Sequence, residues 1–399
     1  MLSLSIPEHV EPIRQKVLSF IENEIYPIES ELLEDKVSSR RGQLMKDLMQ
    51  KAKDAGLWAL GHPEEIGGGG LPFMDYVFVN EVVGRSEIAT VALGTHSLQD
   101  SIMLHRYASD QWRDAYLKPL VDGEVFPSFG MTEPDVASSD PTQLQTKAEL
   151  DGDQWVINGR KWFTSGAGNA AYTTAMVRTE FDAPDHSAFS MIVVPTDTQG
   201  YNIIRDVKVM GQADGHYEVV YDNVRVPKDN LLGPRGQGFK IAQDRLGPGR
   251  IFHCMRWLGQ AQRAFDLMCN RANNRVAFGK PLGQHQQIQK FIFDTAAEIQ
   301  ASRLLTLHAA QKIDQGDEAR IEIGLIKVYG ASMLHNAIDR AIQVHGALGV
   351  TEDTPLERMY RHARYARIYD GADEVHVMNT ARRILRTYGG GSTFDFGLR

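Results

Sequence analysis

The chain has 399 residues, of which 42% are apolar and 24% charged, which is an ordinary globular composition with room for two or three domains. Its formal net charge of −8 disfavours nonspecific binding to nucleic acid, and no apolar run approaches the roughly 18 residues of a membrane span. Residues 1–10 do not resemble a signal peptide, and Cys254 and Cys269 alone make neither a disulfide framework nor a metal site. A cytoplasmic protein without a bound metal is the simplest expectation.

Residues 1–127 are predicted to form an N-terminal α-helical domain. Apolar residues at three- and four-residue spacing give its first helix one apolar face: Val10, Ile13, Val17, Ile21 and Ile25. Pro27 is expected to end or bend that helix. The glycine run 67–70 is interpreted as a plain loop, because it lacks the strand and helix that flank a phosphate-binding loop.

Residues 128–232 change to the pattern of a β domain, a small barrel or sandwich. Short β-rich runs at Gln154–Gly159, Ala175–Val177 and Phe189–Val194 predict strands. The runs 218–221 and 224–227 predict a strand pair that turns at Asp222-Asn223.

Residues 233–399 are predicted to form a C-terminal α-helical domain. Helical segments are expected near 238–274, 284–315, 318–345 and 371–387, with short connections that favour an antiparallel four-helix bundle. The predicted fold class is therefore α+β multidomain, with a β domain between two helical ones.

Several separated motifs resemble those of the acyl-CoA dehydrogenase family over nearly the whole chain. They are Phe129–Asp140 with its Thr-Glu-Pro sequence, Gly159–Ser165, Arg275–Gln286, Gln343–Gly349 and the loop Arg367–Glu374. Each motif alone is weak, but their order and spacing, together with the helix–β–helix arrangement, identify the chain as a member. The segment Arg245–Arg256 and an aspartate at position 370 resemble the branch that includes family members 10 and 11.

The resemblance implies FAD as cofactor. It implies that Met131 and Thr132 contact the polar edge of the flavin, that Trp162 lies against the ring and that Thr164 lies near N5. It implies that Arg275 binds the pyrophosphate, since a guanidinium matches phosphate geometry. The other residues that it assigns to the cofactor are Phe278, His285, Gln286, Gln343, Gly346, Ala372 and Glu374.

The same resemblance makes Asp370 the catalytic base, although the usual member has glutamate there. Removing an α-proton from a thioester requires a base, and the carbonyl oxygen requires hydrogen-bond donors. In the family one donor is the backbone N–H of the base residue, here Asp370. The other position at which members carry a base corresponds to Gly249, which cannot serve. By local sequence alone, Asp370-Gly371 would be a simple turn.

The remaining predicted site residues concern the substrate. Ser138 or Ser139 is expected to contact CoA phosphate, and Tyr369 and Gly371 to shape the loop of the base. Arg250 and His253 share a helix face and are expected to meet a polar or anionic substituent of the acyl group. Arg256 is expected to be a solvated or salt-bridged helix residue.

The expected function is the α,β-desaturation of an acyl-CoA to a trans-2-enoyl-CoA, with an electron-transfer flavoprotein as electron acceptor. A homodimer or homotetramer is expected, because the Arg275 and Gln343 segments resemble ones that complete a neighbour's FAD site. Two alternatives remain open: an oxygen-reactive relative, such as an oxidase, nitroalkane oxidase or flavin monooxygenase, and a non-catalytic acyl-CoA- or flavin-binding protein.

Overall fold

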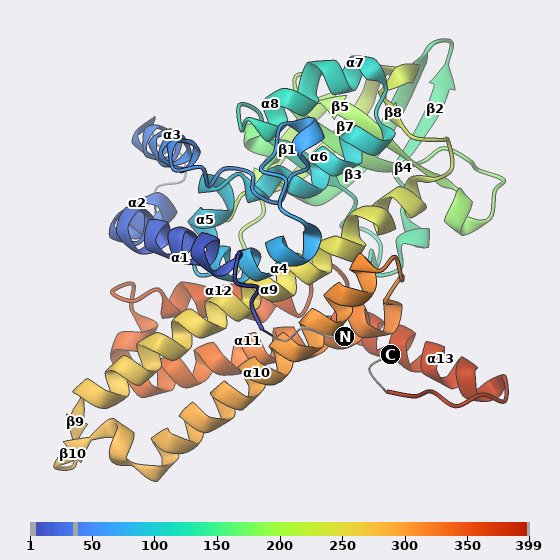
Figure 1. Ribbon diagram of the computed structural model, residues 1–399. Helices are drawn as coiled ribbons and strands as arrows, with labels where there is room; N and C mark the ends of the chain where they lie inside the picture. Colours follow the sequence, from blue (N-terminus) through green and yellow to red (C-terminus); the bar gives the residue numbers. More distant parts are fainter. Residues whose placement is uncertain (1–4, 35–38, 397–399) are drawn as a thin grey trace. The chain divides into compact units, whose positions relative to one another are not determined.

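The computed structural model describes residues 5–34 and 39–396, and the chain divides into two compact units (Figure 1). The first unit combines the described residues of Met1–Trp58, Leu71–Leu93 and Gly247–Arg399. The second unit comprises Ala59–Gly70 and Gly94–Leu246. No helix in the described part of the chain is long and apolar enough to cross a membrane.

The N-terminal helices of the first unit follow the predicted apolar face. Val10, Val17, Ile21 and Ile25 are buried. Helix α1 continues into a π turn and then a 3-10 turn that contains Pro27, so regular α-helical hydrogen bonding ends before this proline. The elements of this segment are α1 (Glu11–Phe20), η1 (Ile21–Ile25), η2 (Tyr26–Ile28), α2 (Glu29–Glu34), α3 (Ser39–Asp54), α4 (Phe73–Val83) and α5 (Glu87–Ala92).

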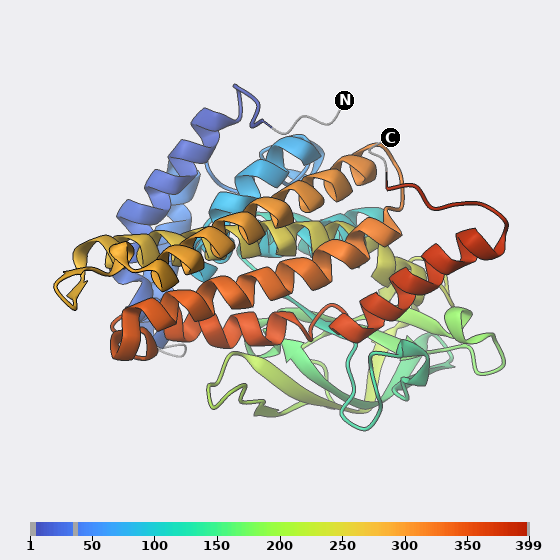
Figure 2. The ribbon, with the colours of Figure 1, turned by 90° about the horizontal axis from the view of Figure 1, so that it is seen from below.

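The C-terminal bundle is built from long helices connected by short turns. Helix α11 packs against α10, α12 and α13, and α10 and α11 run side by side in both views (Figures 1 and 2). Its elements are α9 (Gly238–Asn274), β9 (Val276–Ala277), β10 (Lys280–Pro281), η10 (Leu282–Gln284), α10 (Gln286–Asp314), α11 (Arg320–His345), η11 (Gly346–Val350), α12 (Leu356–Ala366) and α13 (Asp373–Gly389). The four predicted helices correspond to α9, α10, α11 and α13, while α12 was not predicted.

The second unit contains an eight-stranded sheet with strand order β6-β7-β3-β2-β4-β5-β8, and β1 pairs with β4 in parallel. Its strands are β1 (Pro127–Gly130), β2 (Lys147–Asp151), β3 (Gln154–Ser165), β4 (Tyr172–Arg178), β5 (Phe189–Pro195), β6 (Tyr201–Asp206), β7 (His216–Pro227) and β8 (Leu231–Leu232). Its helices include α6 (Leu98–Tyr107), α7 (Asp110–Trp112), η5 (Arg113–Leu117) and α8 (Lys118–Val121). Short 3-10 turns are η3 (Glu64–Ile66), η4 (Thr95–Ser97), η6 (Pro141–Gln143), η7 (Ala167–Asn169), η8 (Asp185–Ser187) and η9 (Lys228–Asn230).

The predicted hairpin at Asp222-Asn223 is wrong. Strand β7 runs through this position without reversing and pairs with β3 on both sides of it. The pairing register shifts opposite Ile157 and Gly159, and Asn223 adopts a positive φ of 49°. Asn158 Oδ1 accepts a hydrogen bond from the Asn223 backbone N–H at 2.8 Å. The polar pair therefore marks a bulge in a long strand, which sequence alone does not distinguish from a turn.

The glycine run 67–70 packs against its own unit. A Cβ on Gly68 would lie 2.2 Å from the carbonyl oxygen of His62, and one on Gly69 would lie 2.8 Å from the Cα of Leu60. Glycine is therefore required here for close contact between two backbone segments. This agrees with the interpretation of the run as a structural loop.

Candidate active site

Asp370 lies in the short loop between α12 and α13, and its backbone is left-handed, with φ of 55°. Aspartate adopts this conformation more readily than most non-glycine residues, and neighbouring side chains contact it here. Arg250 Nε donates to the carbonyl oxygen of Asp370 at 3.1 Å, and His376 Nε2 lies 3.1 Å from the same oxygen. The loop is therefore fixed by one side chain from α9 and one from α13.

The carboxylate of Asp370 is held by an imidazole. Asp370 Oδ2 lies 3.0 Å from His253 Nε2, and the two side chains are 25% and 33% exposed, respectively. The other ring nitrogen, His253 Nδ1, lies 3.0 Å from Nη2 of Arg256. Nη1 of Arg256 donates to Asn80 Oδ1 at 3.4 Å, and burial lowers the pKa of this guanidinium. His253 thus connects an arginine of its own helix to the candidate base.

Residues beside Asp370 give the loop its shape. The hydroxyl of Tyr369 accepts a hydrogen bond of 2.8 Å from Trp257 Nε1, and burial raises its pKa. The Tyr369 ring also contacts His253, with 5.3 Å between centroids. Gly371 has φ of 100°, and a Cβ there would lie 2.7 Å from His376 Nε2. Only glycine fits between the base and α13 without displacing that imidazole.

The next acidic residue, Asp373, is engaged elsewhere. Its carboxylate lies 3.3 Å from Lys327 Nζ and 2.8 Å from Arg367 Nε, at the start of α13. An acidic side chain at this end of a helix is also favoured by the helix dipole. Ala372 is partly buried and Glu374 exposed. Among the neighbouring carboxylates, Asp373 is therefore structural.

In the second unit, the Thr-Glu-Pro segment is anchored by a buried ion pair. Lys161 Nζ lies 2.8 Å from Glu133 Oε1 and donates to the Met131 carbonyl oxygen at 2.9 Å. Glu133 also accepts hydrogen bonds from the backbone N–H groups of Gln145 and Thr146. The backbone N–H of Trp162 donates to the Thr132 carbonyl oxygen at 3.0 Å. These hydrogen bonds hold Met131, Thr132 and Trp162 close together.

Trp162 and Thr164 lie at an irregularity of β3. The pairing with β7 shifts register between Lys161 and Thr164, and Phe163 between them has φ of 49°. Trp162 Nε1 and Thr164 Oγ1 are buried and have no hydrogen-bond partner in the described protein. Buried polar atoms of this kind are uncommon in folded proteins. A bound group with ring nitrogens and carbonyl oxygens would satisfy them, so these residues fit a flavin.

The predicted dinucleotide residues lie at the hairpin end of the bundle. Phe278 is 95% exposed at the tip of the β9–β10 hairpin, where φ values of 52° for Phe278 and 80° for Gly279 fit a type I′ turn. His285 Nε2 lies 3.2 Å from the Ala277 carbonyl oxygen. Figures 1 and 2 show the hairpin at one end of the bundle and α13 toward the other. The remaining predicted residues of this group are also exposed: Arg275, Gln286, Gln343 and Gly346.

The predicted substrate residues differ in their surroundings. Ser138 Oγ accepts a hydrogen bond from the Glu133 backbone N–H at 2.9 Å, whereas Ser139 is exposed. Arg250 and His253 both contact Asp370, one through its carbonyl and one through its carboxylate. Arg256, expected to be a solvated or salt-bridged helix residue, is partly buried and hydrogen-bonds to His253 and Asn80. A buried arginine on an amphipathic helix gives no sequence signal that separates it from an exposed one.

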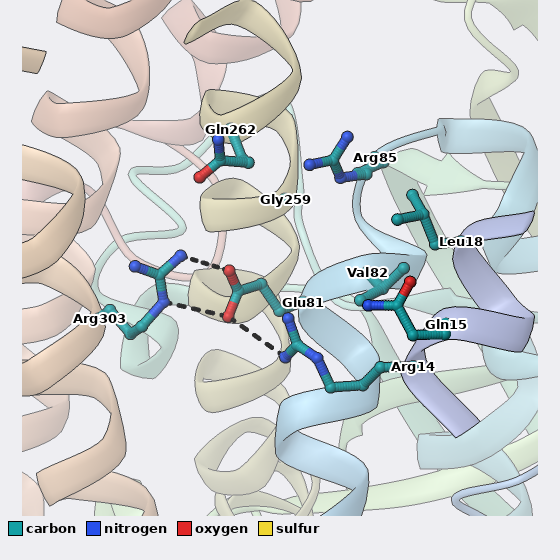
Figure 3. A pocket seen from close by; sticks show the side chains of 9 residues that line it. All are labelled: Arg14, Gln15, Leu18, Glu81, Val82, Arg85, Gly259, Gln262 and Arg303. Atoms are coloured by element: carbon teal, nitrogen blue, oxygen red, sulfur yellow. Dashed lines mark hydrogen bonds and ion pairs between the residues drawn. The ribbon is translucent and has the colours of Figure 1, made fainter. Parts of the chain in front are cut away.

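A polar pocket of the first unit has a different character (Figure 3). Glu81 lies within it, and both Arg303 and Arg14 point toward its carboxylate. Arg85 pairs with Asp266 at 3.0 Å. These ion pairs connect α1 and α4 with the bundle helices, and none of the predicted site residues lines the pocket. We interpret it as a structural ion-pair cluster.

Comparison with known families gives three consecutive matches. The domains described as "Acyl-CoA dehydrogenase, N-terminal domain", "middle domain" and "C-terminal domain" match residues 7–124, 128–224 and 236–385, respectively. The matches cover most of the chain and agree with the predicted order of a helical, a β and a helical segment.

Individual proteins agree with this assignment. The probable acyl-CoA dehydrogenase FadE2 of Mycobacterium tuberculosis is 48% identical over 86% of each chain. Acyl-CoA dehydrogenase family member 11 of Homo sapiens is 40% identical over 93% of this chain, which spans only 50% of that protein. A solved structure from Mycobacterium abscessus, described as an acyl-CoA dehydrogenase, superposes with a TM-score of 0.90 at 37% identity, covering 96% of this chain and 100% of that one. This protein therefore belongs to the acyl-CoA dehydrogenase family of FAD-dependent oxidoreductases.

Proposed function

We propose that the protein converts an acyl-CoA thioester to a trans-2-enoyl-CoA, with Asp370 as the base. The observation that carries this proposal is the fixation of Asp370 at three points, two on its carbonyl and one on its carboxylate. Three side-chain contacts on one loop residue hold both its backbone and its carboxylate in a single position, as a catalytic base requires.

In the proposed reaction the Cα–H bond breaks and its proton goes to the Asp370 carboxylate. The electron pair stays on the substrate and forms the double bond as the β-hydride leaves. When bound, FAD supplies the two-electron acceptor for that hydride. An apolar acyl chain that excludes water from Asp370 would raise its basicity by desolvation. The backbone N–H of Asp370 would donate to the thioester oxygen, where negative charge develops.

The cofactor is assigned to two groups of residues. Met131, Thr132, Trp162 and Thr164 would contact the flavin ring, which agrees with the lack of a hydrogen-bond partner for Trp162 Nε1 and Thr164 Oγ1 among the described residues. Residues at the hairpin end and at the end of α11 would bind the dinucleotide portion of FAD in a neighbouring copy of the chain: Arg275, Phe278, His285, Gln286, Gln343 and Gly346. Ala372 and Glu374, which flank the start of α13, complete the assignment.

We propose that the protein is a homodimer or homotetramer. A phenylalanine at a hairpin tip with 95% exposure and a positive φ is costly unless a partner covers it. Helix α13 also presents four exposed apolar residues: Val377, Met378, Leu385 and Tyr388. A closed symmetric assembly would bury both surfaces.

The substrate proposal concerns a polar or anionic acyl substituent. Arg250 donates Nε to the Asp370 carbonyl oxygen, and its Nη1 and Nη2 groups would bind such a substituent. His253 is already engaged by Asp370, so Arg250 is the stronger candidate of the two. Ser139 is the more accessible candidate for CoA phosphate, because Ser138 bonds to the backbone of Glu133. Electrons would leave through an electron-transfer flavoprotein.

The test is anaerobic mixing of the FAD-loaded protein with a panel of straight-chain, branched and substituted acyl-CoAs. Rapid loss of oxidised-flavin absorbance, with enoyl-CoA as product, is expected for at least one member. Rapid peroxide formation in air would favour an oxidase instead. Acyl-CoA binding without flavin reduction by any member would contradict the proposal. If straight-chain substrates exceed every substituted one in kcat/KM, the substituent assignment is wrong.

A further inference from the structure

His253 has a geometry that fixes its tautomer. A guanidinium has only donors, so the 3.0 Å contact from Arg256 Nη2 requires His253 Nδ1 to accept, without a proton of its own. The neutral ring then carries its hydrogen on Nε2, which faces Asp370 Oδ2 at 3.0 Å. A proton on Nδ1 would place two N–H donors and two positive charges against one another. The ring is therefore held neutral, with its N–H directed at the carboxylate.

We propose that His253 is the positioning residue for the base: as a neutral donor to Oδ2 of Asp370, it fixes the direction in which the carboxylate points. This inference rests on the proposed function, since it requires Asp370 to be the base. His253 is not a proton relay, because its Nε2 already carries a hydrogen and its Nδ1 is blocked by Arg256. The abstracted proton consequently stays on Asp370 until the product leaves.

The arrangement explains how an aspartate serves where the family usually has glutamate. The shorter side chain has fewer rotatable bonds, and His253 fixes its remaining freedom. The backbone contacts from Arg250 and His376 fix the Cα from which it projects. Precise placement matters, because a displacement of about 1 Å can reduce a rate on the order of a hundredfold.

Other ionisable groups surround this pair and must be considered in any pH profile. They are Arg250, Cys254 and Arg256 on α9, Lys327 on α11, Tyr76 on α4, and Tyr369, Asp373 and His376 on the loop and α13. Burial raises the pKa of Tyr369 and lowers that of His376 below its ordinary value. If His253 ionised within the measured range, its ionisation would disappear from the pH profile of a His253 variant. The ionisation of His376 would remain in that profile.

The test compares three variants of His253 in the FAD-loaded protein. Glutamine places an amide donor near the position of Nε2 and can reach Asp370. Asparagine can offer an acceptor to Arg256 near the position of Nδ1 but is too short to reach Asp370. Alanine removes both contacts. A positioning role predicts rescue by glutamine alone, whereas a role in supporting Arg256 predicts rescue by asparagine.

We expect His253→Ala and His253→Asn to lower the limiting rate of anaerobic flavin reduction by about 10- to 100-fold, the cost of a misplaced base. His253→Gln should stay within about fivefold of the unmodified protein, and its rate between pH 5 and 8 should follow the same profile. The matched control is His9→Ala, which removes an exposed His–Asp pair, 2.7 Å from Asp75, and should leave the rate unchanged.

Three results would overturn the inference. These are a His253→Ala rate within twofold of the unmodified protein, equal rates for the glutamine and asparagine variants, or loss of an ionisation between pH 5 and 8 in His253→Gln. Asp370→Asn in the same assay separates the two proposals. If that variant is inactive while His253→Ala is unaffected, only the positioning role fails; if Asp370→Asn is fully active, the proposed function fails as well.

Discussion

The buried pair between Lys161 and Glu133 offers a quantitative test of the segment assigned to the flavin edge. The side chains of Lys161 and Glu133 are 0% and 4% exposed. Replacing Lys161 with methionine removes two charge-assisted hydrogen bonds, to Glu133 and to the Met131 carbonyl. Each of these bonds contributes about 1.5–3 kcal/mol to the free energy of unfolding, so losing both would cost about 3–6 kcal/mol. Removing one partner of a buried ion pair typically costs about 3–5 kcal/mol of stability, which agrees with the value obtained from the hydrogen bonds.

We therefore expect Lys161→Met to lower the melting temperature of the second unit by roughly 6–20 °C. The melting temperature can be measured by thermal denaturation followed by tryptophan fluorescence. Flavin fluorescence in the same experiment reports the release of FAD. The double variant Glu133→Gln/Lys161→Met should recover part of the loss, because no buried charge is left unpaired. The control Lys228→Met breaks an ion pair with Asp153 whose side chains are 54% and 85% exposed, and it should leave the melting temperature nearly unchanged.

The pH dependence of this pair has a defined sign. Burial alone would raise the pKa of Glu133, but Lys161 and two backbone N–H groups lower it below its usual value. A carboxyl whose pKa is lowered in the folded state stabilises the fold above its unfolded pKa of about 4.3, and the stabilisation is lost as pH falls. Melting temperatures of Lys161→Met and Lys228→Met that agree at pH 7 would refute the reasoning.

Three further predictions concern the first unit. Phe278→Ser should shift the protein toward smaller species in light scattering and weaken FAD retention; an unchanged oligomer that retains FAD would contradict the proposed interface. Burial opposes ionisation of Glu87, but His362 and Arg358 lower its pKa to about 2, so Glu87→Gln should reduce the loss of thermal stability as pH falls from 4.5 toward 2. An equal loss in the unmodified protein and in Glu87→Gln would argue against the ion pairs of Glu87 with Arg358 and His362. Asp370→Glu should slow flavin reduction about 10- to 100-fold despite restoring the family's usual residue, because its extra methylene advances the carboxylate by about 1.5 Å. A faster rate would mean that the loop is not built around aspartate.

Local sequence patterns predicted the elements whose structure depends on their own residues. The spacing of apolar residues located α9, α10 and α11 to within two residues or so, since a long amphipathic helix repeats its signal many times. The hairpin at Asp222-Asn223 was predicted wrongly, because a bulge and a turn use similar residues. Only pairing with β3, about 60 residues away in sequence, decides between them.

In the candidate site, too, local motifs could be predicted from the sequence, whereas contacts between distant residues could not. The motif around Asp370 was recognisable, but the contact with His253 joins residues more than a hundred positions apart. Sequence reasoning assigned His253 to the substrate, because nothing local shows where its ring points. Lys161 lies within the recognised Gly159–Ser165 motif, but its burial was not predicted, because only the fold identifies Glu133 as its partner.

The measurement that tests the central claim most directly is single-turnover flavin reduction by Asp370→Asn, using the best acyl-CoA of the panel without oxygen. The variant keeps the shape of the side chain and should retain FAD and bind acyl-CoA, which serve as internal controls for folding. Since an amide cannot accept the α-proton, we expect the reduction rate to fall by about 10²–10⁴-fold or more. Reduction at close to the unmodified rate would show that Asp370 is not the base.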